Sequence, residues 1–172
     1  MRSVSAYEGA LRLAIHALKY SARPRLARRL GELWLQIPEP PFARERYTAL
    51  IPVPMHRARL RERGFNHAEL LARALSARIG VPVAAGVVRR VRATQPLYPL
   101  GPEERREAVA GAFRARLPGE LQGRPLLLVD DIITTGATIS TLAQALQEEG
   151  AGPIDAVSLA RARRPGEDDP TR

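Results

Sequence analysis

The sequence predicts an α/β fold built on an open, mainly parallel sheet with helices on its faces. Segments typical of strands and of helices alternate along most of the 172 residues, the order that builds parallel sheets. Residues 126–130 supply the clearest strand, because four apolar residues precede Asp130, as in a strand buried on both faces. Hydrophobic residues make up 45% of the chain and charged residues 26%, a globular rather than a disordered mixture.

Residues 1–41 are predicted to form a small helical hood, an N-terminal appendage to the core. Residues 7–19 repeat apolar side chains at the spacing of an amphipathic helix. Pro24 suits the first turn of a second helix. Three prolines within residues 38–41 then predict a linker or turn.

Residues 42–160 are predicted to form the core, and residues 161–172 a polar tail. The expected strands span residues 47–53, 86–91, 112–115, 126–130 and 154–159. Between them we expect a basic loop or helical turn at 56–63, a helix capped by Asn66 that ends at Gly80, a short helix at 103–109 and a helix at 138–149. Residues 92–102 carry three prolines without periodicity, which is typical of an exposed loop.

Composition excludes several classes of protein and site. Because the sequence has no cysteine, it can form no disulfide, thiolate metal site or cysteine nucleophile. Its three histidines are too scattered to suggest a zinc site. Apolar runs are far shorter than the ~20 residues that span a bilayer, and no signal-peptide pattern is visible. We therefore expect a cytoplasmic protein without a membrane segment.

Positive charge is concentrated in the first third of the chain. The net charge is +9, of which residues 1–64 carry +8, from 13 basic and 5 acidic residues. Such a segment favours an anionic partner, either a phosphorylated small molecule or a nucleic acid. The alternative is an arginine-rich face that is merely solvated.

The stretch from Leu126 to Thr138 carries the chemistry. Asp130 and Asp131 stand at the carboxyl end of a buried strand, where ligands bind in open α/β sheets. Two adjacent acids repel each other, so a bound ligand or cation would explain them. The following loop is rich in hydroxyls, and the next helix directs its positive end towards the same place, which suits a phosphate. Thr138 can cap that helix. The alternative is an ordinary strand–turn–helix connection with acidic surface residues.

This stretch resembles the phosphoribosyl-pyrophosphate binding motif of type I phosphoribosyltransferases. In that family the acid pair, here Asp130 and Asp131, holds the ribose hydroxyls. The loop that wraps the 5′-phosphate consists here of Thr134, Thr135, Gly136, Ala137 and Thr138. The resemblance implies a type I phosphoribosyltransferase-like fold, phosphoribosyl pyrophosphate as ligand, and Mg²⁺ held directly or indirectly by the two aspartates.

Three further segments resemble the ComF family, phosphoribosyltransferase-like proteins associated with DNA uptake and competence. They are residues 17–20, residues 51–55 with the following 59–67, and residues 92–95 ahead of 111–113. Together with the acid-pair motif they cover the chain from about Leu11 to Leu159. The sequence departs from the family in three ways: it lacks the N-terminal four-cysteine zinc module, has His67 where glutamine is usual, and has Thr134 where some purine-salvage relatives carry an acidic base.

The resemblance also implies roles for residues outside the acid-pair motif. A pyrophosphate loop would consist of Pro52, Val53, Pro54 and Met55, although these prolines also suit a plain strand terminator. Arg63 and Arg92 would be catalytic, because their guanidinium groups suit phosphate oxygens. The loop that contains Arg92, Thr94 and Gln95 would close over the pyrophosphate, unless it is an ordinary surface loop. Lys19 and Tyr20 are weaker candidates for a hood over the acceptor site.

The sequence therefore favours a phosphoribosyltransferase that transfers its phosphoribosyl group to a nitrogenous base and releases pyrophosphate. Two alternatives remain open. One is an accessory protein of DNA uptake that binds single-stranded DNA, and the other is a sensor that binds phosphoribosyl pyrophosphate without catalysis. The acceptor, expected to be a nucleobase, is not named by the sequence, and a homodimer is compatible with the fold.

Overall fold

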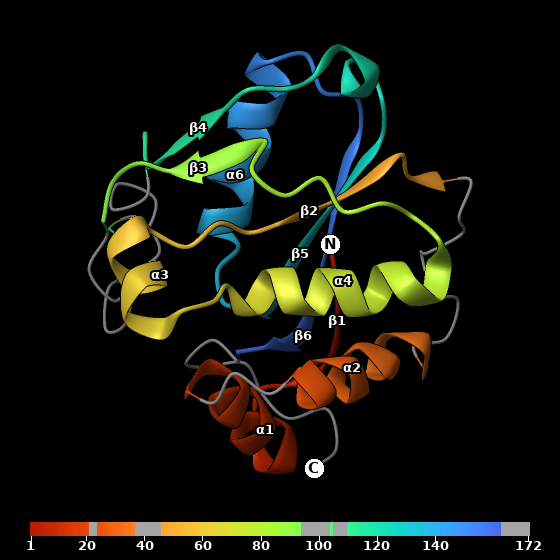
Figure 1. Ribbon diagram of the computed structural model, residues 1–172, viewed down its shortest axis with the longest axis vertical. Helices are drawn as coiled ribbons and strands as arrows, with labels where there is room; N and C mark the ends of the chain where they lie inside the picture. The colour runs from red at the N-terminus through yellow and green to blue at the C-terminus, as the bar shows by residue number, and fades with distance from the viewer. Residues whose placement is uncertain (21–23, 37–45, 94–103, 105–109, 163–172) are drawn as a thin grey trace.

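A four-stranded sheet forms the centre of the computed structural model, which describes residues 1–20, 24–36, 46–93, 104 and 110–162 (Figure 1). All three strand pairings are parallel, which confirms the predicted fold class. The strand order is β1 (Arg2–Ala6), β6 (Ile154–Arg161), β5 (Leu126–Ile133) and β2 (Ala49–Pro52). Buried apolar residues dominate the central strands β5 and β6 and the edge strand β2, as expected for parallel strands covered on both faces.

The edge strand β1 has no counterpart among the predicted elements. Its five residues pair with β6, and the hydroxyls of Ser3 and Ser158 lie 2.7 Å apart across the two strands. Its side chains are exposed or half-buried, so the sequence shows no apolar alternation at this edge. The N-terminal part of the chain, predicted as a helical hood, therefore contributes a strand to the central sheet as well as the expected helices.

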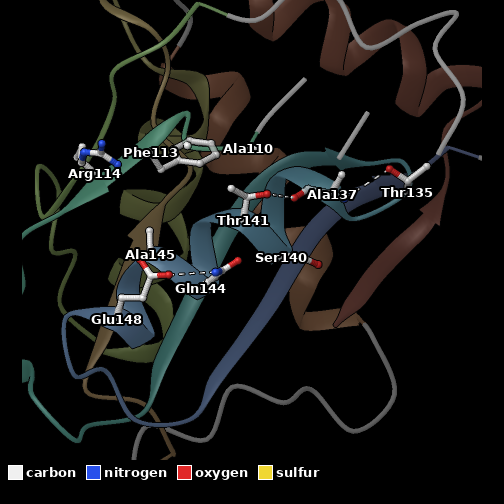
Figure 2. A pocket seen from close by; sticks show the side chains of 11 residues that line it. Ala110, Phe113, Arg114, Thr135, Ala137, Ser140, Thr141, Gln144, Ala145 and Glu148 are labelled. Carbon is white, nitrogen blue, oxygen red and sulfur yellow. Dashed lines mark hydrogen bonds between the residues drawn. The ribbon is translucent and has the colours of Figure 1, made fainter. Parts of the chain in front are cut away.

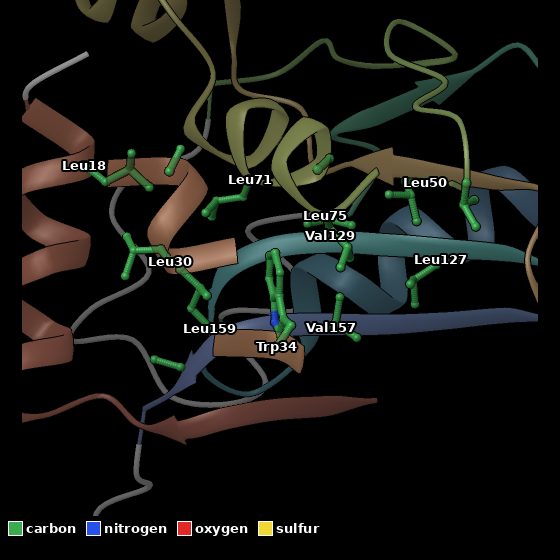
Figure 3. Packing of buried hydrophobic residues seen from close by; sticks show 14 of the residues in the cluster. Leu18, Leu30, Trp34, Leu50, Leu71, Leu75, Leu127, Val129, Val157 and Leu159 are labelled. Atoms are coloured by element: carbon green, nitrogen blue, oxygen red, sulfur yellow. The ribbon is translucent and has the colours of Figure 1, made fainter. Parts of the chain in front are cut away.

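One face of the sheet is covered by helices of the first half of the chain. They are α1 (Gly9–Tyr20), α2 (Pro24–Glu32), the 3-10 turn η1 (Leu33–Gln36) and α4 (His67–Ile79). Figure 3 shows their buried side chains packed against Leu127, Val129 and Val157 of the sheet. Trp34 is fully buried and donates a hydrogen bond from Nε1 to the carbonyl oxygen of Ser158, 3.0 Å away. This bond fixes η1 to the central strand β6.

The opposite face is covered by α6 (Ala137–Glu148) and by a two-stranded antiparallel ribbon. The ribbon consists of β3 (Val88–Arg90) and β4 (Phe113–Ala115). Leu126 and Leu128 point to this face, because successive side chains of a strand alternate. Leu142 and Leu146 of α6 pack against the same cluster. Figure 1 shows α6 beside β3 and β4, away from α1 and α2.

Most expected elements are present, with boundaries shifted by a few residues. The basic segment forms the helix α3 (Arg57–Arg63), and α4 begins after Asn66 and ends at Gly80, as predicted. Four stretches lie outside the described residues: the linker at 38–41, residues 94–102 of the proline-rich loop, residues 103 and 105–109 of the expected short helix, and residues 163–172 of the tail. The boundary at residue 41 stays a prediction. Among the described helices, none combines the length and the apolar character needed to cross a membrane.

Candidate functional site

A pocket of about 430 Å³ opens where the carboxyl ends of β2 and β5 meet the ends of α1, α3, α4 and α6. It brings together most of the predicted site residues, namely Lys19, Val53, Pro54, Met55, Arg63, Asp130, Asp131, Thr134 and Thr138. Pro52, Tyr20, Arg92, Thr135, Gly136 and Ala137 are not part of its described lining. The topology explains this meeting, because the carboxyl ends of parallel strands share one edge of the sheet.

The two adjacent aspartates at the end of β5 have different surroundings. Asp131 is 4% exposed, and its Oδ2 lies 2.9 Å from Nζ of Lys19. Its Oδ1 lies 3.4 Å from Nε2 of His67 and accepts a hydrogen bond from the backbone N–H of Ile132 at 2.9 Å. Asp130 is less buried, and its Oδ1 accepts the backbone N–H of Asp131 at 2.8 Å. Asp131 is thus held by protein groups, whereas Asp130 faces the pocket.

These surroundings shift the pKa values of the two carboxyls in opposite directions. Burial, and then the negative charge of Asp131, raise the pKa of Asp130 well above its usual value. Burial alone would also raise the pKa of Asp131, but His67 and Lys19 together lower it below its usual range. Asp131 is therefore the carboxylate that keeps its charge, and Asp130 is the first of the two to take up a proton.

Asn66 joins the Pro52–Met55 loop to the start of α4. Its Oδ1 accepts the backbone N–H of Ala68 at 3.1 Å, which is the predicted helix cap. Its Nδ2 donates to the carbonyl oxygen of Val53 at 3.0 Å, a contact that sequence reasoning did not predict. The side-chain amide supplies one acceptor and two donors, so a single residue can fix both segments.

Arginines from two elements line the pocket beside the acids. Arg63 at the end of α3 lies over the ring of Tyr20, with 5.2 Å from its guanidinium carbon to the ring centre. Arg59 and Arg90 also line the pocket. Burial, and then the positive charge of Arg59, lower the pKa of Arg90. An anion bound between the two side chains would oppose this shift, because a negative charge favours the charged guanidinium.

Sequence reasoning selected Arg92 rather than Arg90 for this part of the site. Arg92 is exposed and does not contribute to the described lining, so its catalytic role stays a prediction. Arg90 ends β3, and its guanidinium lies 5.6 Å from the ring centre of Phe113 on the paired strand. The alternation of side chains along β3 was the available signal, because it separates Arg90 from its exposed neighbour Arg89.

The Thr134–Thr138 loop turns β5 into α6 at the pocket. Gly136 precedes the helix with φ 84°, a left-handed conformation that glycine adopts readily. The expectation that Thr138 caps the helix is wrong, because Gly136 occupies the cap position and Thr138 already lies in the first turn. Thr134 and Thr138 line the pocket, where the positive end of the helix favours an anion.

Thr135 and Ala137 line a second cavity of about 560 Å³ between α6 and β4. Figure 2 shows Ser140, Thr141 and Gln144 of α6 on one side of it and Arg114 of β4 on the other. Thr135 Oγ1 accepts the backbone N–H of Ala137 at 3.4 Å. Four of the five loop residues are therefore divided between two cavities, and Thr134 and Thr138 are the pair that lines the pocket with the acids.

The acid pair and His67 do not form a closed metal site by themselves. One ligand atom each from His67, Asp130 and Asp131 lie within 4.8 Å of one another. The ammonium of Lys19 already lies 2.9 Å from Asp131, so a divalent ion held by both carboxylates would be repelled. Mg²⁺ is commonly bound through one or two carboxylates together with substrate phosphates and water. Asp130 fits that arrangement, whereas a closed protein cage does not fit.

The parallel sheet, with an acid pair and a hydroxyl-lined loop at its carboxyl edge, has the type I phosphoribosyltransferase fold. Residues 62–171 match the family model described as the phosphoribosyl transferase domain. The chain belongs to this family and, within it, to the ComF proteins.

Named relatives support this assignment. "DNA utilization protein YhgH" of Salmonella typhi is 36% identical over 165 residues, which cover 92% of this chain and 70% of the relative. "Competence protein F" of Haemophilus influenzae is 36% identical over 115 residues, which cover 66% of this chain and 50% of the relative. Adenine phosphoribosyltransferase from Saccharomyces cerevisiae is 14% identical with a TM-score of 0.50 and covers 84% of this chain and 72% of that one, which shows the fold alone.

Proposed function

We propose that the protein binds phosphoribosyl pyrophosphate together with Mg²⁺ and transfers the phosphoribosyl group to a nitrogenous base. The bond between the anomeric carbon and the pyrophosphate oxygen breaks, and a bond from that carbon to a base nitrogen forms. Pyrophosphate leaves with the electron pair, and the proton of the attacking nitrogen passes to water. The observation that carries the proposal is the single pocket that unites Asp130, Thr138 and Arg63.

Each part of the pocket suits one part of this ligand. Thr134 and Thr138, with the first turn of α6, would bind the 5′-phosphate. Asp130 would accept a sugar hydroxyl, because its carboxyl is the less engaged of the pair. Arg63 and its neighbours Arg59 and Arg90 would neutralise the charge that develops on the departing pyrophosphate. When bound, Mg²⁺ would add to that charge neutralisation.

Catalysis in this proposal comes from positioning and electrostatics. The sugar passes through a state with positive charge at the anomeric carbon, and no covalent help from the protein is required. The pocket would hold donor and base in line, which removes much of the entropic barrier. A pocket lined by arginines, threonines and carboxylates suits such a mechanism.

A screen of nucleobases with phosphoribosyl pyrophosphate and Mg²⁺, read as pyrophosphate release, tests the transfer. The proposal expects release with at least one base and loss of that release in Asp130→Asn. Donor binding without release for every base would support the sensor instead. Glu120→Gln is the matched control, because it removes one acidic charge from an exposed position outside the described pocket lining.

Single-stranded DNA binding is the second candidate function, and the helix α3 favours it. Arg57, Arg59 and Arg61 are exposed on this helix, and α3 buries none of its side chains. Relatives carry the names "DNA utilization protein" and "Competence protein". Filter binding at two salt concentrations tests it: affinity should fall steeply with salt. An absence of binding at low salt would exclude this function.

A further inference from the structure

Lys19 is the only lysine in a sequence that otherwise relies on arginine for positive charge. It lies near the end of α1, whose residues Ile15 and Leu18 are fully buried in the core. Its side chain is 23% exposed and lines the pocket, with Nζ 2.9 Å from Oδ2 of Asp131. The packed helix therefore holds an ammonium group at the acid pair from a segment distant in sequence.

The contacts of Asp131 fix its carboxylate from several directions. Lys19 approaches Oδ2, while His67 and the backbone N–H of Ile132 approach Oδ1. The side chain is only 5% exposed, so its charge depends on these partners. Without these partners, the negative charge of Asp131 would repel the carboxylate of its neighbour Asp130. An ammonium at Oδ2 therefore stabilises the arrangement of both acids.

We propose that Lys19 is a positioning residue of the sugar subsite, which it preforms by fixing the carboxylate of Asp131 beside Asp130. The sugar hydroxyls then meet acceptors whose geometry is set before binding, so less free energy is spent on ordering them. The inference rests on the proposed function, because the sugar concerned is the ribose 5-phosphate part of the donor. It gives α1 a role in binding the donor.

The division of Asp131 between two partners explains why lysine suits this position. An ammonium is a compact point charge, whereas a guanidinium fork tends to engage both oxygens of a carboxylate. An arginine here would compete with His67 for Oδ1. We therefore expect Lys19→Arg to restore only part of the function lost in Lys19→Met.

Calorimetric titration with two ligands separates positioning from general damage to the pocket. Ribose 5-phosphate contains the sugar, whereas inorganic pyrophosphate addresses only the arginine side. At constant Mg²⁺, Lys19→Met should weaken the binding of ribose 5-phosphate by at least about tenfold, because Asp131 loses a charge partner, and the binding of pyrophosphate by less than about threefold. Arg12→Met is the control, because it removes one exposed positive charge from the same helix.

The outcomes distinguish this inference from the proposed function. Ribose 5-phosphate binding that is equal in the natural protein and in Lys19→Met overturns the role of Lys19 alone. If Lys19→Met weakens the binding of both ligands equally, Lys19 has a general structural role, and the proposed positioning role is overturned. If the natural protein binds neither ribose 5-phosphate nor phosphoribosyl pyrophosphate, the proposed function fails and this role fails with it.

The single lysine permits a second measurement that does not depend on Lys19→Met folding. Acetylation by an N-hydroxysuccinimide ester, followed by peptide mass spectrometry, reports the reactivity of Lys19 separately from that of the terminal amine. The ion pair engages the ammonium, so Asp131→Asn should raise the acetylation rate of Lys19, and ribose 5-phosphate should lower it in the natural protein. Equal rates in the natural protein and in Asp131→Asn would overturn the proposal.

Discussion

At the residue scale, Asn66 carries two separable contacts. Its Oδ1 caps α4, and its Nδ2 holds the carbonyl of Val53 in the Pro52–Met55 loop. Serine retains the capping oxygen without the amide donor. Asn and Ser cap equally well, so Asn66→Ser should lower the free energy of unfolding only by the lost bond to Val53, about 1 kcal/mol. It should nevertheless bind pyrophosphate more weakly, because the loop loses its anchor.

Asn66→Ala is the comparison that completes this prediction. It removes both contacts and should lower the free energy of unfolding by about 1 kcal/mol more than Asn66→Ser does, the usual value of a helix cap. Urea unfolding and calorimetry with pyrophosphate measure the two effects. Pyrophosphate binding that is unchanged in Asn66→Ser would show that the Val53 contact has no part in the site.

A second residue-scale prediction concerns Tyr47, at the opposite end of the sheet. Its hydroxyl donates to Oδ2 of Asp155 at 2.7 Å, and this bond, followed by the charge of Arg46, lowers the pKa of Asp155 against the effect of burial. A lowered carboxyl pKa stabilises the fold above the ordinary value of about 4 and loses that effect as the pH falls. Tyr47→Phe should lower the unfolding free energy by about 1 kcal/mol at neutral pH.

The difference in unfolding free energy between the natural protein and Tyr47→Phe should shrink at acidic pH. A protonated Asp155 has no negative charge for the tyrosine hydroxyl to stabilise. Urea unfolding of both proteins at neutral pH and below the ordinary aspartate pKa measures it. A constant difference across this range would contradict the assigned cause. The phenylalanine keeps the buried ring, so packing is held fixed.

At the element scale, the contact between α2 and α4 depends on Gly31. A Cβ added at this position would lie 2.9 Å from the Cβ of Ala74, closer than carbon atoms normally approach. Gly31→Ala should therefore destabilise the protein by about 1–3 kcal/mol, as overpacking does. Gly119→Ala is the control, since nothing lies within 4 Å of its added Cβ. Equal unfolding temperatures for Gly31→Ala and Gly119→Ala would contradict the close packing of α2 against α4.

The sequence predicted elements well where the pattern is local. Asn66 and Gly80 predict the two ends of α4, and an unbroken apolar run predicts β5. β1 was missed, because a half-buried edge strand lacks apolar alternation and is identified only by its pairing with β6. Thr138 was assigned as a cap because hydroxyl residues favour that position, yet the left-handed Gly136 occupies it.

The candidate site follows the same division. Asp130, Asp131 and the threonine loop are contiguous, so their meeting could be predicted. Two other contacts could not be predicted, because sequence periodicity does not show which separate segments meet in the fold. They are the contact of Lys19 with Asp131 and that of Asn66 with Val53. Arg90 was missed because its importance depends on which side of β3 faces the pocket.

At the scale of the whole molecule, the excess positive charge has a local and a distributed part. Arg59, Arg63 and Arg90 line the pocket, whereas Arg57 and Arg61 are exposed on α3. If single-stranded DNA follows α3, Arg57→Gln with Arg61→Gln should reduce the slope of log affinity against log salt by roughly 1.4, two phosphate contacts at about 0.7 each.

The control for this prediction carries the same change of charge elsewhere. Arg116→Gln with Arg124→Gln replaces two exposed arginines outside the described pocket lining. Filter binding over a series of salt concentrations gives the slopes. Equal slopes for the two double variants would assign DNA binding to net charge instead of α3.

The most direct measurement is calorimetric titration of phosphoribosyl pyrophosphate with Mg²⁺ into the natural protein and into Asp130→Asn with Asp131→Asn. The double substitution keeps the size of both side chains and removes both carboxylates of the proposed sugar subsite. The account predicts saturable binding by the natural protein and none by the double variant. Circular dichroism should show that the double variant keeps its fold. Equal affinity of the two proteins would contradict the assignment of this pocket as the donor site.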